Sequence, residues 1–288
     1  MGAGAFKNTL IAPSGGGLYA GTGAVLTQQT FENCTFGLLH IPASVDLVGS
    51  TYDFIEPLIA PQGLTLRIDA IAIAQDQFKD WDLVGDLVMP NFRGSYPGGF
   101  HNAYNSPLAE DRGQLVLGNG LKELILTGNC FENCSSFTGE LDLSSPTRGI
   151  GKKTFKGCSN LEGLILPTNT LQGIDDYAFS GCSSINTPLV FGEPLLGLGI
   201  GAFENCSSIG GNVIFKDAIS IISQDCFKGC NSINNIYINR DASIVGAGAF
   251  SGPGGSLFVT TAHIASYGGV GASFQGMTVA LWSNYPNV

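Results

Sequence analysis

The sequence predicts a repeat solenoid of the α/β class, built mostly from short parallel strands and turns, with little helix. Twelve phenylalanines recur at a nearly constant spacing between Phe6 and Phe274, and short runs of alternating apolar residues follow many of them. A fixed period of about 20–50 residues is typical of solenoids, in which each coil buries its apolar side against its neighbours.

The repeated phenylalanines, called anchors below, set the period. Neighbouring anchors are 22–25 residues apart, except for one interval of 31 residues between Phe100 and Phe131. Cysteine is the third residue after six of them, which are Phe31, Phe131, Phe155, Phe179, Phe203 and Phe227. We expect the last five of these phenylalanines to stack as a buried ladder.

Strands are predicted shortly after the anchors. An apolar residue stands six positions after several anchors, as at Leu161 and Ile233, and an alternating run follows it. Alternation over a few residues is typical of a short strand with one buried face. The sequence therefore predicts neighbouring parallel strands at 161–167, 212–215 and 235–238. Gly, Asn, Ser, Asp and Pro fill the segments between them, as turns require.

The domain organisation follows from the period. We expect a single solenoid over residues 1–288 with about twelve coils of about 24 residues. The long interval predicts an irregular insertion at 91–113, and residues 257–288 are expected to form a C-terminal cap. The length alone would also allow two globular domains.

Composition excludes several classes of protein. The 288 residues are 44% apolar and 12% charged, which excludes intrinsic disorder. The formal net charge is −10 and no basic run exists, so nucleic acid is not an expected partner. No uninterrupted apolar run of about 18 residues is present, so membrane insertion is not expected either.

The repeat resembles the bacterial BspA-like leucine-rich-repeat family. The resemblance rests on a small residue followed by Phe-x-x-Cys, and then on Leu161, Leu164, Leu166 and Pro167 in a Leu-x-x-Leu-x-Leu-Pro pattern. It covers nearly the whole chain and is strongest over residues 131–250. Between Phe31 and Phe131 the consensus Cys is replaced by Pro57, Trp81 and Ala103. The resemblance implies a right-handed leucine-rich-repeat-like stack of coils on a secreted or surface protein used for adhesion and protein binding, and it implies no enzyme.

The eight cysteines are expected to be free thiols. Six occupy the slot after an anchor, and Cys130 and Cys226 stand just before an anchor where other copies have Ala. Free Cys behaves as a small buried apolar residue in such slots. The Cys-x-x-x-Cys pairs could be zinc half-sites, but the three histidines lie far apart in the sequence. Asn-Cys-Ser/Thr at Asn33, Asn133 and Asn205 matches glycosylation acceptors, although each is simply the repeat consensus.

No catalytic, cofactor or metal site is predicted. The paired carboxylates Asp175/Asp176 and Asp80/Asp82 fall in predicted turns, where Asp favours local backbone hydrogen bonds. The expectation is therefore a protein that is not an enzyme and has no cofactor.

The insertion at 91–113 is the candidate partner-binding site. It gathers Phe92, Tyr96, His101 and Tyr104 among Gly, Asn and Pro. Loops carry function more often than the scaffold does, and aromatic residues are suited to recognition. Packing of the segment back onto its own coil would explain the same residues.

These observations favour a protein-binding or adhesion module of a bacterial surface or secreted protein. A structural subunit or spacer of a cell-envelope or virion assembly is the alternative. Residues 8–31 and 242–288 contain no Asp, Glu, Lys or Arg, which suggests end-to-end contact with further chain or another subunit, or simply a neutral surface. No secretory signal opens the chain, so an extracellular or cell-surface location implies that a signal was removed.

Overall fold

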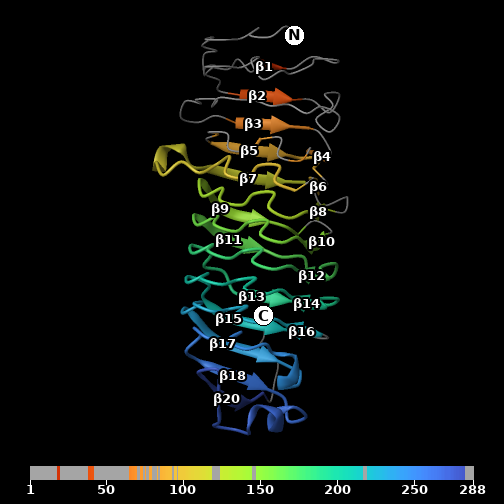
Figure 1. Cartoon of the computed structure of the whole chain (residues 1–288), viewed down its shortest axis with the longest axis vertical. Coiled ribbons are helices and arrows are strands. Elements are labelled where there is room, and N and C mark those ends of the chain that lie inside the picture. Colours follow the sequence, from red (N-terminus) through yellow and green to blue (C-terminus); the bar gives the residue numbers. More distant parts are fainter. Residues whose placement is uncertain are drawn as a thin grey trace.

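The computed structural model describes residues 18–19, 38–41, 65–69, 72–73, 75, 78–79, 83, 85–92, 94–95, 97–118, 124–144, 147–216 and 219–282. In these residues the chain winds as a stack of coils with parallel strands lying side by side (Figure 1). The predicted parallel-strand solenoid is confirmed. Helix within the described residues is limited to three short 3-10 segments, η1 (Ala109–Asp111), η2 (Ala242–Ile244) and η3 (Ile264–Tyr267).

The main sheet runs the length of the stack in two sections (Figure 1). The first has the order β1 (Leu18–Tyr19), β2 (Leu38–Ile41), β3 (Thr65–Ile68), β5 (Asp86–Met89), β7 (Gly113–Leu117), β9 (Phe137–Asp142) and β11 (Leu161–Ile165). The second has the order β13 (Leu189–Phe191), β15 (Gly211–Phe215), β17 (Ile233–Ile238), β18 (Ser256–Val259), β20 (Met277–Leu281) and β19 (Ser273–Phe274). The three strands predicted from the sequence are present as β11, β15 and β17, with ends that differ by one or two residues.

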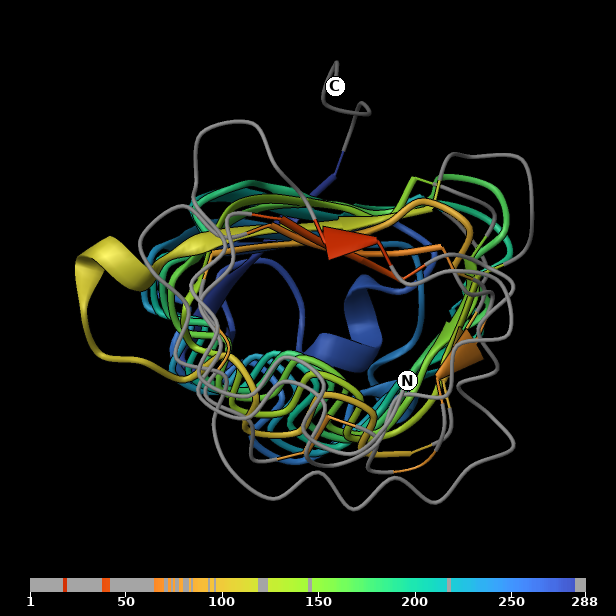
Figure 2. The ribbon, with the colours of Figure 1, turned by 90° about the horizontal axis from the view of Figure 1, so that it is seen from above.

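The side sheet forms a second face of the stack. Its order is β16 (Ile221–Ile222), β14 (Gly197–Leu198), β12 (Gly173–Ile174), β10 (Thr147–Ile150), β8 (Leu124–Leu126), β6 (Gly94–Ser95) and β4 (Ala72–Ile73). The turns that carry the anchors form the third side, and Figure 2 shows the three sides around the core when the stack is seen along its axis.

The anchors stack inside the core as predicted. From Phe100 to Phe227 the ring centroids of neighbouring anchors are 5.2–5.5 Å apart, with interplanar angles of 1–13°. Phe78 extends the ladder, with its ring 4.8 Å from that of Phe100. All of these rings are buried. Stacking buries the apolar side that no single coil could remove from water.

The backbone conformation of the turns explains which residue types stand between the anchor and the cysteine. From Phe100 to Phe274, the second residue after each anchor has a positive φ, for example 62° at Asn133 and 77° at Gly157. Asn and Gly adopt this left-handed conformation more readily than other residues. The recurring Asn in Phe-Glu-Asn-Cys therefore has a backbone reason that is independent of glycosylation.

The C-terminal end of the core is covered by η3 and by the antiparallel pair β19 and β20 (Figure 2). The Tyr267 ring lies 4.8 Å from Phe274, which contacts the last described ladder ring, Phe250, at 6.5 Å. A single solenoid over all of residues 1–288 stays a prediction, because many residues before Thr65 lie outside the described ones.

Candidate functional site

The extra residues of the long interval can be located by the position of the next strand. In several regular coils the main-sheet strand begins six residues after the anchor, as in β9 after Phe131 and β11 after Phe155, and Gly113 pairs in register with the first residue of β9, Phe137. After Phe100 the strand β7 begins only at Gly113, which is thirteen residues later. Seven residues are therefore inserted, and they are residues 106–112, called the 106–112 loop below. The sequence-based range of 91–113 was wider than the insertion itself.

The 106–112 loop stands out from the side of the stack, where Figure 2 shows η1 in yellow. Its tip is held by bonds within the loop: the Ser106 hydroxyl donates to Asp111 Oδ2 at 2.5 Å, and the Leu108 amide donates to Ser106 Oγ at 3.3 Å. The Leu108 residue is 51% exposed. Glu110 and Arg112, two and four residues later, are also exposed, so the loop presents a large aliphatic side chain and two opposite charges to solvent.

Phe92 and Tyr104 are core residues, which corrects their assignment as surface contacts for a partner. Both rings are buried, and Phe92 packs edge-on against Phe131. The Tyr104 ring lies 4.5 Å from Phe137, the residue that pairs in register with Gly113. Gly113 leaves the strand-start position without a side chain, and the tyrosine ring fills core space next to it. The alternative stated from the sequence, packing onto the segment's own coil, accounts for both aromatic rings.

The hydroxyl of Tyr104 is unusual within this core. It is buried and has no hydrogen-bond partner among the described residues. Burial raises the pKa of Tyr104 well above 10.0, and the nearby Cys134 and Asp86 raise it further. The phenol is therefore neutral at any physiological pH and contributes packing only.

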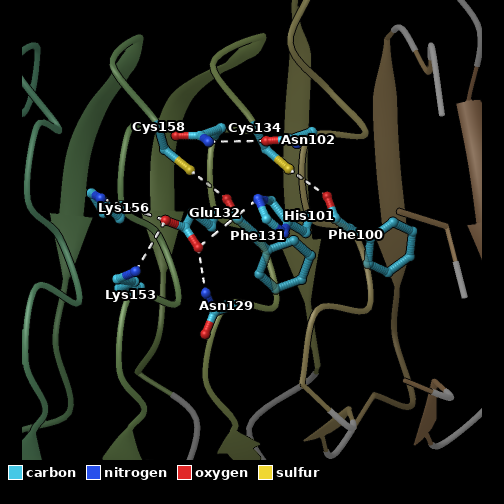
Figure 3. Close-up of polar contacts among 11 residues, drawn as sticks. Phe100, His101, Asn102, Asn129, Phe131, Glu132, Cys134, Lys153, Lys156 and Cys158 are labelled. Atoms are coloured by element: carbon cyan, nitrogen blue, oxygen red, sulfur yellow. Dashed lines mark hydrogen bonds and ion pairs between the residues drawn. The ribbon is translucent and has the colours of Figure 1, made fainter. Parts of the chain in front are cut away.

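His101 lies in an ion cluster on the turn side of the stack, and Tyr96 lies outside the described residues. His101 Nε2 is 4.0 Å from Glu132 Oε2 (Figure 3). The Glu132 side chain is only 8% exposed, and its Oε1 lies 3.6 Å from Lys156 Nζ and 3.9 Å from Lys153 Nζ. The Asn129 side-chain amide also donates to Glu132 Oε2.

The cluster ties the irregular coil to the regular ones. His101, Glu132 and Lys156 each follow an anchor directly, in three successive coils. Glu204 and Lys228 repeat the pairing of Glu132 and Lys156 three coils further on, at 3.4 Å. The sequence analysis missed this cluster, although the charges directly after the anchors were a visible signal. Its geometry is suited to holding neighbouring coils together, because the buried Glu132 carboxylate requires compensating charges from adjacent coils.

The cysteines form a second column, as the repeat positions predicted. The seven described cysteines are free and buried. The thiol of Cys134 donates to the Phe100 carbonyl at 3.0 Å, and Cys158 donates to the Phe131 carbonyl at 3.1 Å (Figure 3). Cys182, Cys206 and Cys230 repeat this bond to the anchor of the preceding coil. Burial raises the pKa of the Cys134 thiol from 9.0 to about 12.

The predicted turn role of the paired aspartates is supported for the described pair. Asp175 Oδ1 accepts from the Asp176 amide at 3.0 Å, and Asp176 Oδ1 accepts from the Ile200 amide at 2.9 Å. Asp80 and Asp82 lie outside the described residues. Among the described residues no group of three or more His, Cys, Asp or Glu side chains is arranged to hold a metal ion. In that same part of the chain, no helix combines the length and apolar character needed to span a membrane.

Comparison with known proteins identifies the repeat. Residues 125–254 match the BspA type leucine rich repeat region in six copies. A leucine-rich repeat protein from Bacteroides ovatus is similar in structure, with a TM-score of 0.55 and 17% identity over 92% of this chain and 69% of that one. A leucine rich cell surface protein from Faecalibacterium prausnitzii gives a TM-score of 0.45 and 13% identity over 85% and 79% of the two chains. No curated protein matches the chain. Residues 125–254 of the chain therefore carry six copies of the BspA-type leucine-rich repeat.

Proposed function

We propose that this chain is a non-enzymatic protein-binding or adhesion module of a bacterial surface or secreted protein, and that the 106–112 loop is its recognition element. The observation that carries the proposal is the projection of this loop from an otherwise regular array. The family supports a role in protein interaction and a place outside the cell.

The loop has the physical properties of a recognition element. Its hydrogen bonds hold the tip in one conformation before a partner arrives, which lowers the entropy lost on binding. Leu108 offers aliphatic surface that a partner's pocket could desolvate. Glu110 and Arg112 of the same loop are exposed and can form charged contacts at the rim of such a pocket, which favour one partner over another.

The test uses a deletion that restores the regular repeat. Removing residues 106–112 joins Asn105 to Gly113 in the register of Ser136 and Phe137, so the 31-residue interval becomes 24. Wild type, this deletion and the point variant Leu108→Ser are applied to an array of purified secreted and surface proteins. Ile165→Ser, at another exposed aliphatic residue, is the matched control.

We expect wild type and the Ile165→Ser control to bind a partner that the deletion and Leu108→Ser bind at least about tenfold more weakly. Thermal melting checks that the variants remain folded. Binding by the deletion with unchanged affinity would exclude the loop as the recognition element.

A structural subunit remains the second candidate, because one end of the stack is free of charge. Residues 242–288 contain no Asp, Glu, Lys or Arg, and Val270 in the capping segment is 70% exposed. A subunit of this kind should self-associate with concentration in sedimentation experiments, and Val270→Lys should abolish that association. A binding module should stay monodisperse when it is alone.

A further inference from the structure

The outer face of the side sheet is hollowed into a groove of about 670 Å³. The groove crosses β8, β10, β12, β14 and β16, and it is called the side-sheet groove below. Its volume is within the usual range of about 300–1,000 Å³ for ligand sites. Leu126 lies at one end, Ile221 at the other, and a row of glycines between them.

Two of these glycines are not required by the fold. Gly149, Gly173, Gly197 and Ile221 pair in register across four neighbouring strands. A Cβ atom at Gly149 would meet nothing within 4 Å, and one at Gly173 would meet only the Gly197 carbonyl oxygen at 3.8 Å. Neither residue has a positive φ. Gly149 adjoins an irregularity in the pairing of β10 with β8, whereas Gly173 pairs regularly on both sides.

Other glycines in the same groove behave differently. A Cβ atom at Gly151 would lie 2.7 Å from the Leu126 carbonyl oxygen, so close packing of the coils requires glycine there. Glycine weakens a strand, and it often marks a bulge, a tight bend or a place where another chain or ligand approaches closely. The irregularity beside Gly149 is of the first kind, whereas the regular pairing of Gly173 leaves close approach of a ligand as its explanation.

The end wall of the groove is aliphatic. The Ile221 side chain lies over Gly197, since a Cβ atom there would be 2.8 Å from Ile221 Cγ2. Ile221 is 52% exposed, and Leu196, whose carbonyl accepts the Ile221 amide, is 54% exposed. These side chains can bury an apolar group of a ligand.

One rim of the groove is acidic. Asp175 and Asp176 follow β12, and because the strands are parallel, residues that follow them share one rim. Asp176 Oδ2 is 3.6 Å from Lys152 Nζ, whereas exposed Asp175 pairs with no cation among the described residues. Two carboxylates against one lysine leave this rim net negative and complementary to a cation. The groove lining also contains Arg148, which precedes Gly149 on β10 and therefore lies towards the opposite rim.

We propose that the side-sheet groove binds an extended segment of a partner protein, with a Lys or Arg side chain opposite Asp175 and an aliphatic side chain against Ile221. The proposal rests on the proposed protein-binding function and adds a second surface to it. Asp175 follows β12 and Ile221 lies on β16, two strands further on, so the two contacts are about 10 Å apart along the stack. A segment in the extended polyproline II conformation rises about 3.1 Å per residue with three residues per turn, so side chains three positions apart cover that distance and lie on the same face. A bare glycine floor suits a polypeptide because it lets the ligand's backbone approach closely.

The experiment uses the full chain labelled with ¹⁵N and three synthetic peptides of eight residues. The probe is a Gly/Ser peptide with one lysine and one leucine three positions apart. One control peptide has glutamate in place of lysine, and the other has serine in place of leucine. The protein variants are Gly149→Val with Gly173→Val, and Asp175→Asn. Gly254→Val is the matched control, because a Cβ atom there also meets nothing within 4 Å but the residue lies outside the groove.

We expect the lysine–leucine peptide to shift the amide signals of Gly149, Gly173 and Gly197, and both control peptides to bind at least about tenfold more weakly. The double valine variant should lose binding while its melting temperature stays equal or rises, because valine favours strands. Gly254→Val should bind like wild type.

Any of three results would overturn the groove assignment. The lysine–leucine peptide could cause no shift, the glutamate peptide could bind equally well, or the double valine variant could bind as tightly as the wild type. The 106–112 deletion separates the two proposals. It should leave peptide binding at the groove unchanged while it removes binding on the protein array. Failure of the groove alone therefore leaves the loop proposal standing, and the converse also holds.

Discussion

The anchor ladder gives the sharpest prediction about stability, and Phe179 lies at its centre. Its ring is fully buried, with neighbouring ring centroids 5.3 Å away in Phe155 and 5.2 Å away in Phe203. Phe179→Ala should lower the free energy of unfolding by about 3–5 kcal/mol, the usual loss for a buried aromatic truncation.

A second variant separates stacking from simple burial. Phe179→Leu keeps most of the apolar volume but loses two ring pairs. Each pair contributes about 0.5–1.5 kcal/mol beyond its buried area, so the expected loss is about 1–3 kcal/mol. The exposed control Ile165→Ala should change the free energy of unfolding by no more than about 0.5 kcal/mol.

Urea unfolding followed by circular dichroism and by fluorescence measures these differences. Coincident transitions and equal m-values are required, because repeat arrays can lose cooperativity. A loss below about 1 kcal/mol for Phe179→Ala would refute the buried ladder. A Phe179→Leu variant with nearly the stability of the wild type would show that stacking contributes little beyond volume.

Three further predictions concern Cys134, Glu132 and Tyr104, whose side chains lie near the anchor ladder. Because burial raises the pKa of Cys134 to about 12, its stabilising contribution should be complete below about pH 9 and fall by about 1.4 kcal/mol per pH unit towards pH 12. Cys134→Ala should reduce the overall slope in urea titrations by about that amount, because burial also raises the pKa of other thiols such as Cys158 and Cys182. A reductant should leave the melting temperature of the wild type unchanged. Glu132→Gln should lower the free energy of unfolding by about 1–3 kcal/mol, less at high salt, and by more than Glu204→Gln, whose carboxylate is more exposed. Tyr104→Phe should melt at the same or a higher temperature because its hydroxyl has no partner, whereas Tyr104→Ala should lose about 3–5 kcal/mol in chemical denaturation.

Much of the fold could be predicted because its signals are local and repeated. The anchor spacing defined the coils, and alternation after Leu161 and Ile233 located β11 and β17 to within two residues at each end. The slot after the anchor identified buried thiols outside disulfides, and all five of these cysteines that the structure describes are free. Each of these features recurs at nearly the same place in several described coils, so one pattern is confirmed several times.

The candidate site could not be assigned in the same way, because it depends on contacts between coils. The sequence marked a long interval around Tyr104, but only the position of β7 showed that residues 106–112 are the insertion and that the ring turns into the core beside Phe137. The side-sheet groove likewise exists only where Gly149 and Gly173, in separate coils, meet in one register. Sequence periodicity determined which residues repeat. The tertiary structure decided which of them face solvent together, because that depends on the register in which distant coils stack.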